Sequence, residues 1–250
     1  MEQCREGSFK RQHYAYLASI EEHHFWFRAR KELVLWAMQN ACPRLGSFLE
    51  IGYGTGYMLN AVAKAYPDCR LNGSDIFEEG IKFARQRCAA ATLIQMDARQ
   101  IPFTGEMDAA GAFDVLEHIR DDQIVLSQMF KALRPGGAVI LTVPQHPFLW
   151  SGFDEMSCHV RRYTEKELTG KLKDAGFAIE YRTSFMALLF PCIALDRMLK
   201  SKQACAIDAV GVNPLFNRIL ESVLWMERLL IKAGVRFGFG GSLLVVARKP

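Results

Sequence analysis

The chain has 250 residues, of which 50% are hydrophobic and 23% are charged, and 31 Lys and Arg against 27 Asp and Glu give a formal net charge of +4. This length and composition fit one large α/β domain, or one domain with an insertion, and exclude disorder, collagen and coiled coil. So small a net charge, with no long run of Lys or Arg, also excludes general nucleic-acid binding.

The cysteines and the N-terminal residues indicate the compartment. Seven cysteines are scattered without a C-x-x-C pair, and the first 20 residues contain no apolar core. The sequence therefore predicts free thiols, a reducing cytoplasm and no signal peptide. The most membrane-like uncharged stretch, Thr183–Leu195, is shorter than the roughly 20 apolar residues that cross a bilayer. We expect a cytoplasmic protein, or at most one that is peripheral at the inner membrane surface.

Strand-like and helix-like segments alternate along the chain, which is typical of a parallel sheet covered by helices on both faces. The predicted strands are Ser47–Ile51, Arg70–Ser74, Ala91–Gln95, Met107–Phe113, Ala138–Val143, Phe177–Arg182 and Ser242–Arg248. The predicted helices are Tyr57–Tyr66, a helix ending at Arg87, Asp122–Leu133 and Thr164–Ala175. A turn is expected at Arg134-Pro135-Gly136-Gly137.

A glycine turn follows the first predicted strand. Its sequence is Glu50-Ile51-Gly52-Tyr53-Gly54-Thr55-Gly56, which is G-x-G-x-G. The third glycine of a dinucleotide site is missing because Tyr57 stands in its place, and no Gly-Lys-Ser/Thr follows, so a nicotinamide oxidoreductase and a P-loop are both disfavoured. Glu50 would repel a phosphate but suits a cation. The turn therefore predicts a nucleoside with a positively charged tail.

Acidic residues stand at the ends of three successive strands: Glu50, Asp75 and Asp97. Asp75 is placed to accept hydrogen bonds from ribose hydroxyls, and Asp97 to meet an adenine amino group. Taken singly, each acid is more often a helix cap. Three acids at successive strand ends favour the ligand-binding interpretation.

Five motifs occur in a fixed order. They are Phe48-Leu49-Glu50-Ile51-Gly52-Tyr53-Gly54-Thr55-Gly56, Asp75-Ile76, Asp97-Ala98, Phe113-Asp114-Val115-Leu116-Glu117-His118-Ile119 and Leu133-Arg134-Pro135-Gly136-Gly137. With these motifs the chain closely resembles the class I S-adenosylmethionine-dependent methyltransferases over roughly Ala41–Tyr181 and the final strand. The resemblance implies a doubly wound, mostly parallel seven-stranded Rossmann-like α/β fold, with Ser242–Arg248 inserted antiparallel beside the fifth strand.

The resemblance also implies a cofactor site for S-adenosyl-L-methionine. Glu50 and the loop of Gly52, Tyr53, Gly54 and Gly56 would hold the methionine part. Asp75 with Ile76 would hold the ribose, and Asp97 with Ala98 the adenine. The stretch from Phe113 to Glu117, which includes Asp114 and Val115, would line the cofactor near its reactive methyl group. Tyr53 departs from the small residue or Cys of relatives, so its ring would pack over the cofactor or partly fill its pocket.

The flanking segments resemble a bacterial branch related to the ubiquinone-biosynthesis O-methyltransferases. The aromatic segment His23–Arg30 is expected either to pack in the core or to form a lid, with Phe27 against the methionine chain and Arg28 or Arg30 reaching its carboxylate.

The acceptor is expected beyond the carboxyl ends of the strands, where several loop residues are able to act on it. His146, then His118, and also His159 are candidates for removing a proton from a hydroxyl acceptor, although His118 could instead cap the next helix. Arg161 and Arg162 would form a structural ion pair with Asp154 and Glu155, or bind an acidic acceptor. No zinc-type Cys/His spacing is present and methyl transfer from a sulfonium requires no metal, so no metal site is expected.

Residues 184–241 form a predicted insertion that is rich in apolar residues at helical spacing. Seven basic against four acidic residues place +3 of the net charge there. The insertion could cover an apolar acceptor, contact a membrane peripherally, form a homodimer interface or simply pack on the sheet.

The expected organisation is thus a helical lid over 1–40, a methyltransferase domain over 41–183 and 242–250, and the insertion. The expected function is methyl transfer to a small, apolar or lipid-like acceptor at oxygen. The alternative is a non-catalytic cofactor-binding or assembly protein with the same fold.

Overall fold

The structure is a computed structural model that describes residues 11–199 and 213–250. Cys4, Cys205 and the remaining parts of the expected lid and insertion lie outside the described residues. No disulfide joins the cysteines of the described residues, which are Cys42, Cys69, Cys88, Cys158 and Cys192. No helix within the described ranges is long and apolar enough to cross a membrane.

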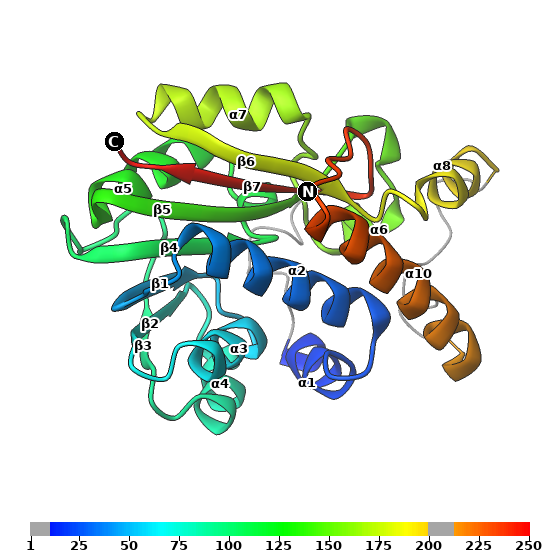
Figure 1. Cartoon of the computed structure of the whole chain (residues 1–250). Helices are drawn as coiled ribbons and strands as arrows, with labels where there is room; N and C mark the ends of the chain where they lie inside the picture. The colour runs from blue at the N-terminus through cyan, green and yellow to red at the C-terminus, as the bar shows by residue number, and fades with distance from the viewer. Residues whose placement is uncertain (1–10, 200–212) are drawn as a thin grey trace.

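Seven strands form one sheet in the order β3-β2-β1-β4-β5-β7-β6 (Figure 1). The strands are β1 (Ser47–Ile51), β2 (Arg70–Asp75), β3 (Thr92–Gln95), β4 (Met107–Phe113), β5 (Leu133–Pro144), β6 (Ala178–Phe185) and β7 (Ser242–Arg248). The first five strands pair in parallel, and β7 runs antiparallel between β5 and β6. The predicted fold class is therefore confirmed, including the place of the last strand.

Helices cover both faces of the sheet because successive strand residues point to opposite sides. The helices are α1 (Arg11–Ile20), α2 (Phe25–Ala41), α3 (Tyr57–Ala65), α4 (Ile81–Arg87), α5 (Asp122–Ala132), α6 (Gly152–Met156), α7 (Glu165–Asp174), α8 (Phe190–Leu199) and α10 (Pro214–Lys232). Short 3-10 turns are η1 (Glu78–Gly80), η2 (Leu116–His118) and η3 (Pro147–Leu149).

Phe48 of β1 belongs to a buried cluster with α2, α3 and α4, and its neighbour Leu49 belongs to a second cluster with α5 and α7. All of these side chains are at most slightly exposed. Because β1, β2 and β4 run parallel, the loops that follow them lie at the same edge of the sheet, where a ligand site is expected.

Two element boundaries differ from the prediction by three residues or more. The segment Arg134–Gly137 was expected to be a turn, but β5 begins at Leu133 and pairs with Met107 before the register shifts. This bulge uses Gly136, whose φ of +77° suits glycine. Strand β6 also runs to Phe185 instead of ending at Arg182, because β7 continues to pair with it up to Ser242.

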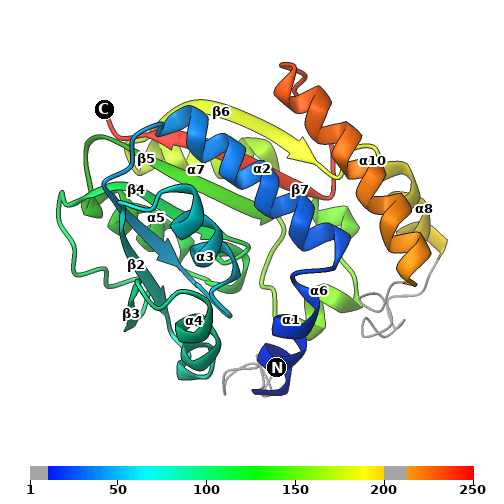
Figure 2. The ribbon, with the colours of Figure 1, turned by 60° about the horizontal axis from the view of Figure 1, so that its bottom comes forward.

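The insertion returns to the N-terminal part of the chain: α10 lies along α2 (Figure 2). The Asn217 side chain accepts a hydrogen bond from the Phe25 amide at 2.9 Å and donates one to the His23 carbonyl at 2.9 Å. Arg28 of α2 forms an ion pair with Glu221 of α10 at 2.8 Å. These contacts join the expected lid and the expected insertion into one layer.

Candidate active site

The glycine loop after β1 combines two tightly packed glycines with one open position. Gly52, Gly54 and Gly56 have φ values of +70°, +55° and +78°. A Cβ on Gly52 would lie 2.5 Å from a Val115 methyl carbon, and one on Gly56 would lie 2.7 Å from the Cα of Ala84. A Cβ on Gly54 would meet no atom of the described chain within 4 Å. The loop therefore leaves space beside Gly54, where a ligand can approach the backbone.

Glu50 supplies an acidic group directly before the loop. The residue is 2% exposed, and its Oε2 has no hydrogen-bond partner in the described part of the chain. Burial raises the pKa of this carboxyl well above its ordinary value, and the nearby Arg30 opposes that shift. A buried carboxylate with a free oxygen fits the positively charged methionine end of S-adenosylmethionine.

Asp75 both bounds the loop and faces the same edge. Its Oδ2 accepts a hydrogen bond from the Gly54 amide at 2.9 Å, and its Oδ1 accepts one from the Phe77 amide at 3.0 Å. Burial raises the pKa of Asp75, while these backbone hydrogen bonds oppose the shift. Asp75 does not cap a helix, because Phe77 occupies the N-cap position of η1. Each of its oxygens retains a lone pair for a ribose hydroxyl. Ile76, next in sequence, is 52% exposed.

After the end of β3, Asp97 forms an ion pair, whereas Ala98 lies in the core. Both oxygens of Asp97 bind the Arg99 guanidinium, at 3.1 and 2.7 Å, and Arg99 also pairs with Asp121 at 3.2 Å. The hydrogen bonds from Arg99 lower the pKa of Asp97. Ala98 is buried in the second core cluster. The Asp97 carboxylate is therefore already bound to Arg99, and an adenine amino group would have to share this carboxylate with Arg99.

The residues after β4 divide between the core and the open edge. The ring of Phe113 packs against Gly111 and Phe48 in the core, so the backbone of Phe113, not its ring, faces the edge. Asp114 has a φ of +58° and forms an ion pair with Arg30. Val115 packs over Gly52.

Tyr53 lies beneath the loop. It is buried, and its ring lies 3.0 Å from the position of a Cβ on Gly73. Burial and the neighbouring Asp75 raise the pKa of Tyr53 to about 12. Its hydroxyl has no hydrogen-bond partner within the described ranges. The ring therefore belongs to the core cluster and supports the loop from below.

The aromatic segment at the start of α2 brings Arg30 to the site. Arg30 is 8% exposed, and its guanidinium lies over the rings of Trp26 and Phe27 at 4.5 and 5.6 Å. Of the two arginines considered from sequence, Arg30 reaches the carboxyl edge of β4, whereas Arg28 is turned to α10. Phe27 packs edge-on against Tyr57, with ring centroids 6.4 Å apart.

A buried polar network that the sequence did not indicate ties the N-terminal helix to the loop. Thr55 donates a hydrogen bond to Glu21 at 2.5 Å, and Arg87 pairs with Glu21 and donates to Thr55 at 2.6 Å. Arg87 also donates to the Ala18 carbonyl at 2.9 Å. The participants come from three separate segments, so no spacing in the sequence could reveal them.

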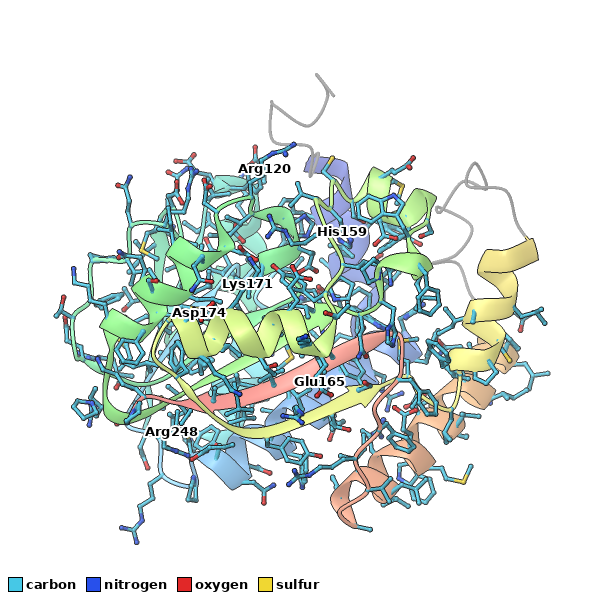
Figure 3. All side chains as sticks on the ribbon, turned by 90° about the horizontal axis from the view of Figure 1, so that it is seen from above. Arg120, His159, Glu165, Lys171, Asp174 and Arg248 are labelled. Carbon is cyan, nitrogen blue, oxygen red and sulfur yellow. The ribbon has the colours of Figure 1, made fainter. Side chains whose placement is uncertain are left out.

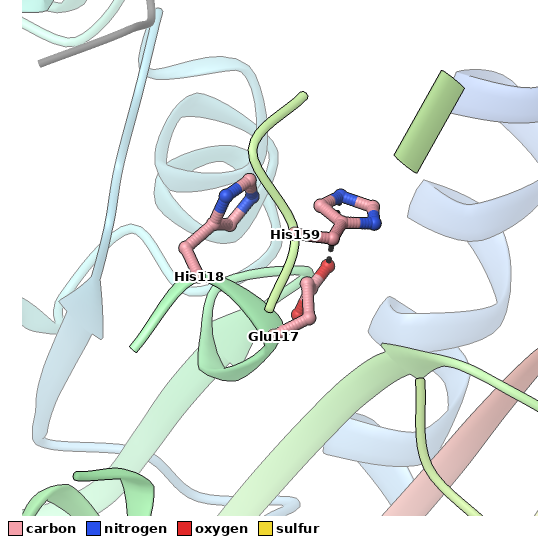
Figure 4. Close-up of side chains that lie close together, drawn as sticks. All are labelled: Glu117, His118 and His159. Carbon is pink, nitrogen blue, oxygen red and sulfur yellow. Dashed lines mark ion pairs between the residues drawn. The ribbon is translucent and has the colours of Figure 1, made fainter. Parts of the chain in front are cut away.

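Two of the three candidate histidines meet at the end of η2. The rings of His118 and His159 are 4.7 Å apart, and both lie beside Glu117 (Figure 4). Desolvation and then His159 lower the pKa of His118, although part of the side chain reaches the surface. The proposed capping role of His118 is wrong, because Asp121 occupies the N-cap position of α5.

His159 lies at the end of the sheet where the candidate site is, and Arg248 lies at the opposite end (Figure 3).

The third candidate histidine, His146, directly follows β5. Its φ is +63°, and its ring neighbours Phe148 and Phe190 at centroid distances of 5.2 and 5.6 Å. Desolvation, and then Arg162, lower the pKa of His146. Its Nε2 has no hydrogen-bond partner among the residues that the structure describes.

The two arginines of the acceptor loop have structural partners. Arg162 pairs with Asp154 at 2.7 Å, as expected. Arg161 pairs with Asp122 at 2.8 Å, not with Asp154 or Glu155. Both guanidinium groups are therefore held by carboxylates, which favours the structural interpretation.

The parallel order of β1 to β5, the antiparallel β7, the glycine loop and the free carboxylate of Glu50 define a class I S-adenosylmethionine-dependent methyltransferase domain. A family model described as a methyltransferase domain matches residues 12–181. The chain belongs to this family.

Relatives agree with this class. A probable S-adenosylmethionine-dependent methyltransferase of Mycolicibacterium smegmatis is 29% identical over 167 residues, which are 66% of this chain and 63% of that protein. A ubiquinone biosynthesis O-methyltransferase of Psychrobacter cryohalolentis is 27% identical over 181 residues, 68% of this chain and 64% of that protein. The matches thus span less than two thirds of these relatives.

Among solved structures, the Haemonchus contortus phosphoethanolamine N-methyltransferase 2 in complex with S-adenosyl-L-methionine aligns with a TM-score of 0.66. The alignment covers 100% of this chain and 59% of that chain at 19% identity, so it shows the shared fold.

Proposed function

We propose that this protein transfers a methyl group from S-adenosylmethionine to an oxygen of a small, apolar acceptor. The observation that carries the acceptor class is an aromatic wall at the carboxyl edge of β5, made of Phe148, Phe190 and Phe239 beside His146. Neighbouring rings in this wall are 5.2 to 6.2 Å apart, yet Phe148 is 65% exposed. An exposed aromatic wall beside a free imidazole nitrogen fits an apolar acceptor with a hydroxyl group.

When bound, the cofactor supplies a methyl group on a positively charged sulfur. Glu50 holds its cationic end, the backbone at Gly54 allows it to approach, and Asp75 with Ile76 faces the nucleoside. Phe27 and Arg30 close the site from α2. Alignment of the two reactants contributes about 7 to 11 kcal/mol in such reactions.

His146 is the general base in this proposal. Its lowered pKa keeps the imidazole neutral near pH 7, which is the form that accepts a proton. Its unpaired Nε2 lies against Phe148 and Phe190, where an apolar acceptor would place a hydroxyl group. The ubiquinone biosynthesis O-methyltransferase among the relatives supports an oxygen target.

The experiment combines calorimetry with product identification. The full chain is titrated with S-adenosylmethionine and then incubated with methyl-labelled cofactor and a bacterial lipid and metabolite extract. We expect binding and a labelled ether or ester product identified by mass spectrometry. Binding without any labelled product would favour the non-catalytic alternative, and a labelled amine would remove the oxygen assignment.

A further inference from the structure

Glu117, His118 and His159 converge at the end of η2 (Figure 4). Each offers one ligand atom, and these atoms all lie within 4.8 Å of one another. Glu117 is fully buried, and neither of its carboxylate oxygens has a hydrogen-bond partner within the described part of the chain. A buried carboxylate left in this state is costly unless a cation completes it.

The second contact of His159 fixes which nitrogen faces Glu117. Nδ1 of His159 lies 2.8 Å from Oδ1 of Asp154, so it donates its proton to that carboxylate. In the neutral imidazole, which is the form that binds a metal ion, Nε2 then carries the lone pair; it lies 4.0 Å from Oε1 of Glu117. This separation is too long for a hydrogen bond, but two bonds of about 2.1 Å to one ion between the atoms span it.

The carboxylate behind His159 is itself held rigidly. Asp154 accepts hydrogen bonds from the Ser151 amide and hydroxyl at 2.8 and 2.9 Å and pairs with Arg162 at 2.7 Å. Metal-binding histidines commonly donate their second ring N–H to a carboxylate in this way, which orients the ring and raises its basicity.

The two arginines near the cluster do not compensate the charge of Glu117. Arg30 is paired with Asp114, and Arg162 is paired with Asp154. Neither guanidinium forms a hydrogen bond or ion pair with Glu117 among the described contacts. Two imidazole nitrogens and one carboxylate oxygen form a donor set that suits first-row transition metals better than magnesium or calcium.

We propose that Glu117, His118 and His159 bind one divalent first-row transition metal ion, with coordination positions left open for an oxygen of the acceptor. The metal site stands on its own geometry; its contact with an acceptor hydroxyl rests on the proposed function. A hydroxyl bound to such an ion has a lower pKa, so the general base of the proposed function, His146, would remove its proton more readily.

Cobalt(II) absorption tests the site without any assay of activity. The full chain, treated with a chelator and dialysed, is titrated with Co²⁺ while visible absorption is recorded, and with Zn²⁺ in a calorimeter. We expect one ion per chain, a visible band from nitrogen ligands and a rise in thermal stability on binding.

Three variants locate the ion. Glu117→Gln, His118→Ala and His159→Ala should each lower metal affinity at least about tenfold and abolish the thermal shift. Glu117→Gln removes a buried charge while keeping the side-chain shape, so it should remain folded by circular dichroism. His23→Ala is the matched control, because His23 is exposed and outside the cluster, and it should bind as the wild type does.

Absence of stoichiometric binding to the wild type, or wild-type affinity in folded Glu117→Gln, would overturn the metal site. Methyl transfer by a chain that binds no metal would refute the site and retain the proposed function. Metal binding at these residues without any methylated product would retain the site and refute the function.

Discussion

Glu50 and Asp75 end neighbouring strands, but their carboxylates have different partners. The carboxylate of Asp75 accepts hydrogen bonds from the amides of Gly54 and Phe77. Glu50 keeps one buried oxygen without a partner in the described chain. Asp75 therefore shapes the loop as well as facing the site, whereas Glu50 is the one of these two carboxylates whose environment requires a bound cation.

Replacing Gly54 separates cofactor binding from folding. Gly54→Val places a branched side chain in the open space beside the loop, so we expect S-adenosylmethionine binding to be nearly abolished in calorimetry. The positive φ costs on the order of 1–2 kcal/mol in stability. Gly105→Val is the matched control, since Gly105 also has a positive φ (+66°) and open space but precedes β4 at the opposite edge. Equal binding by the two variants would show that the cofactor does not pass over Gly54.

The affinity for S-adenosylmethionine should depend on pH through Glu50. The pKa of Glu50 in the folded chain is raised by burial, so without ligand this carboxyl takes up a proton at a higher pH than in the unfolded chain. A proton competes with the cationic ligand; affinity should therefore rise as pH increases from mildly acidic to neutral, with proton release on binding. Calorimetry in two buffers of different ionisation enthalpy measures that release. The Glu50→Gln variant should bind S-adenosylmethionine more weakly and without the pH dependence. An unchanged pH dependence in this variant would show that Glu50 is not the titrating group.

The site residues that sequence predicted are those whose role follows from strand ends and backbone space. The G-x-G-x-G spacing identified Glu50 and the open position at Gly54 because local chain geometry fixes both. The carboxylate behind His159 and the Glu21–Thr55–Arg87 network depend on segments that meet only after folding. No expectation of a metal ligand set arose, since Glu117, His118 and His159 lack a recognisable metal-binding spacing.

At the scale of the elements, α10 supplies a hydrogen-bond acceptor for an amide at the start of α2. The first amides of a helix have no partner within the helix, and the Asn217 side chain accepts the hydrogen bond of Phe25. Glu227, also on α10, is buried and accepts hydrogen bonds from the Met186 and Leu188 amides at 2.6 and 2.9 Å. The aromatic segment at the start of α2 is thus positioned by the insertion.

Asn217→Ala should loosen this junction. The change leaves the Phe25 amide and the His23 carbonyl without their side-chain partner, so we expect a loss of about 1–2 kcal/mol in unfolding free energy. Hydrogen exchange at Phe25 should also become faster. Asn40→Ala serves as the control, because exposed Asn40 bonds within its own helix to Trp36 and should change stability by less than about 0.5 kcal/mol. Identical exchange at Phe25 in both variants would mean that α10 does not hold α2.

Element types were predictable from periodicity, whereas the start of β5, the end of β6 and the pairing of α10 with α2 were not. A glycine such as Gly136 permits either a turn or a bulge, and pairing with β4 decided for the bulge. The apolar spacing of α10 predicted a helix correctly but not which of its faces would be covered. Only Leu224, Glu227 and Ile231 are buried in this helix.

At the scale of the whole molecule, α10 presents an apolar outer face. Its exposed large apolar residues are Leu215, Phe216, Ile219, Trp225, Met226, Leu229 and Leu230. The acidic residues of the helix bond inward, Glu221 to Arg28 and Glu227 to the backbone, while Arg218 and Lys232 are exposed. An apolar face with outward basic residues complements an anionic membrane surface.

We therefore expect the protein to sediment with anionic vesicles at low salt and to detach as salt rises, because a screened field acts on the basic residues. Neutral vesicles should bind less. Ile219→Glu should reduce sedimentation by placing an acid on the α10 face, whereas Ile124→Glu on α5, at a residue of similar exposure, should not. Light scattering in the same buffers gives the oligomeric state. A stable dimer that ignores both vesicle types would assign the face to a homodimer interface, since its apolar residues would already be covered.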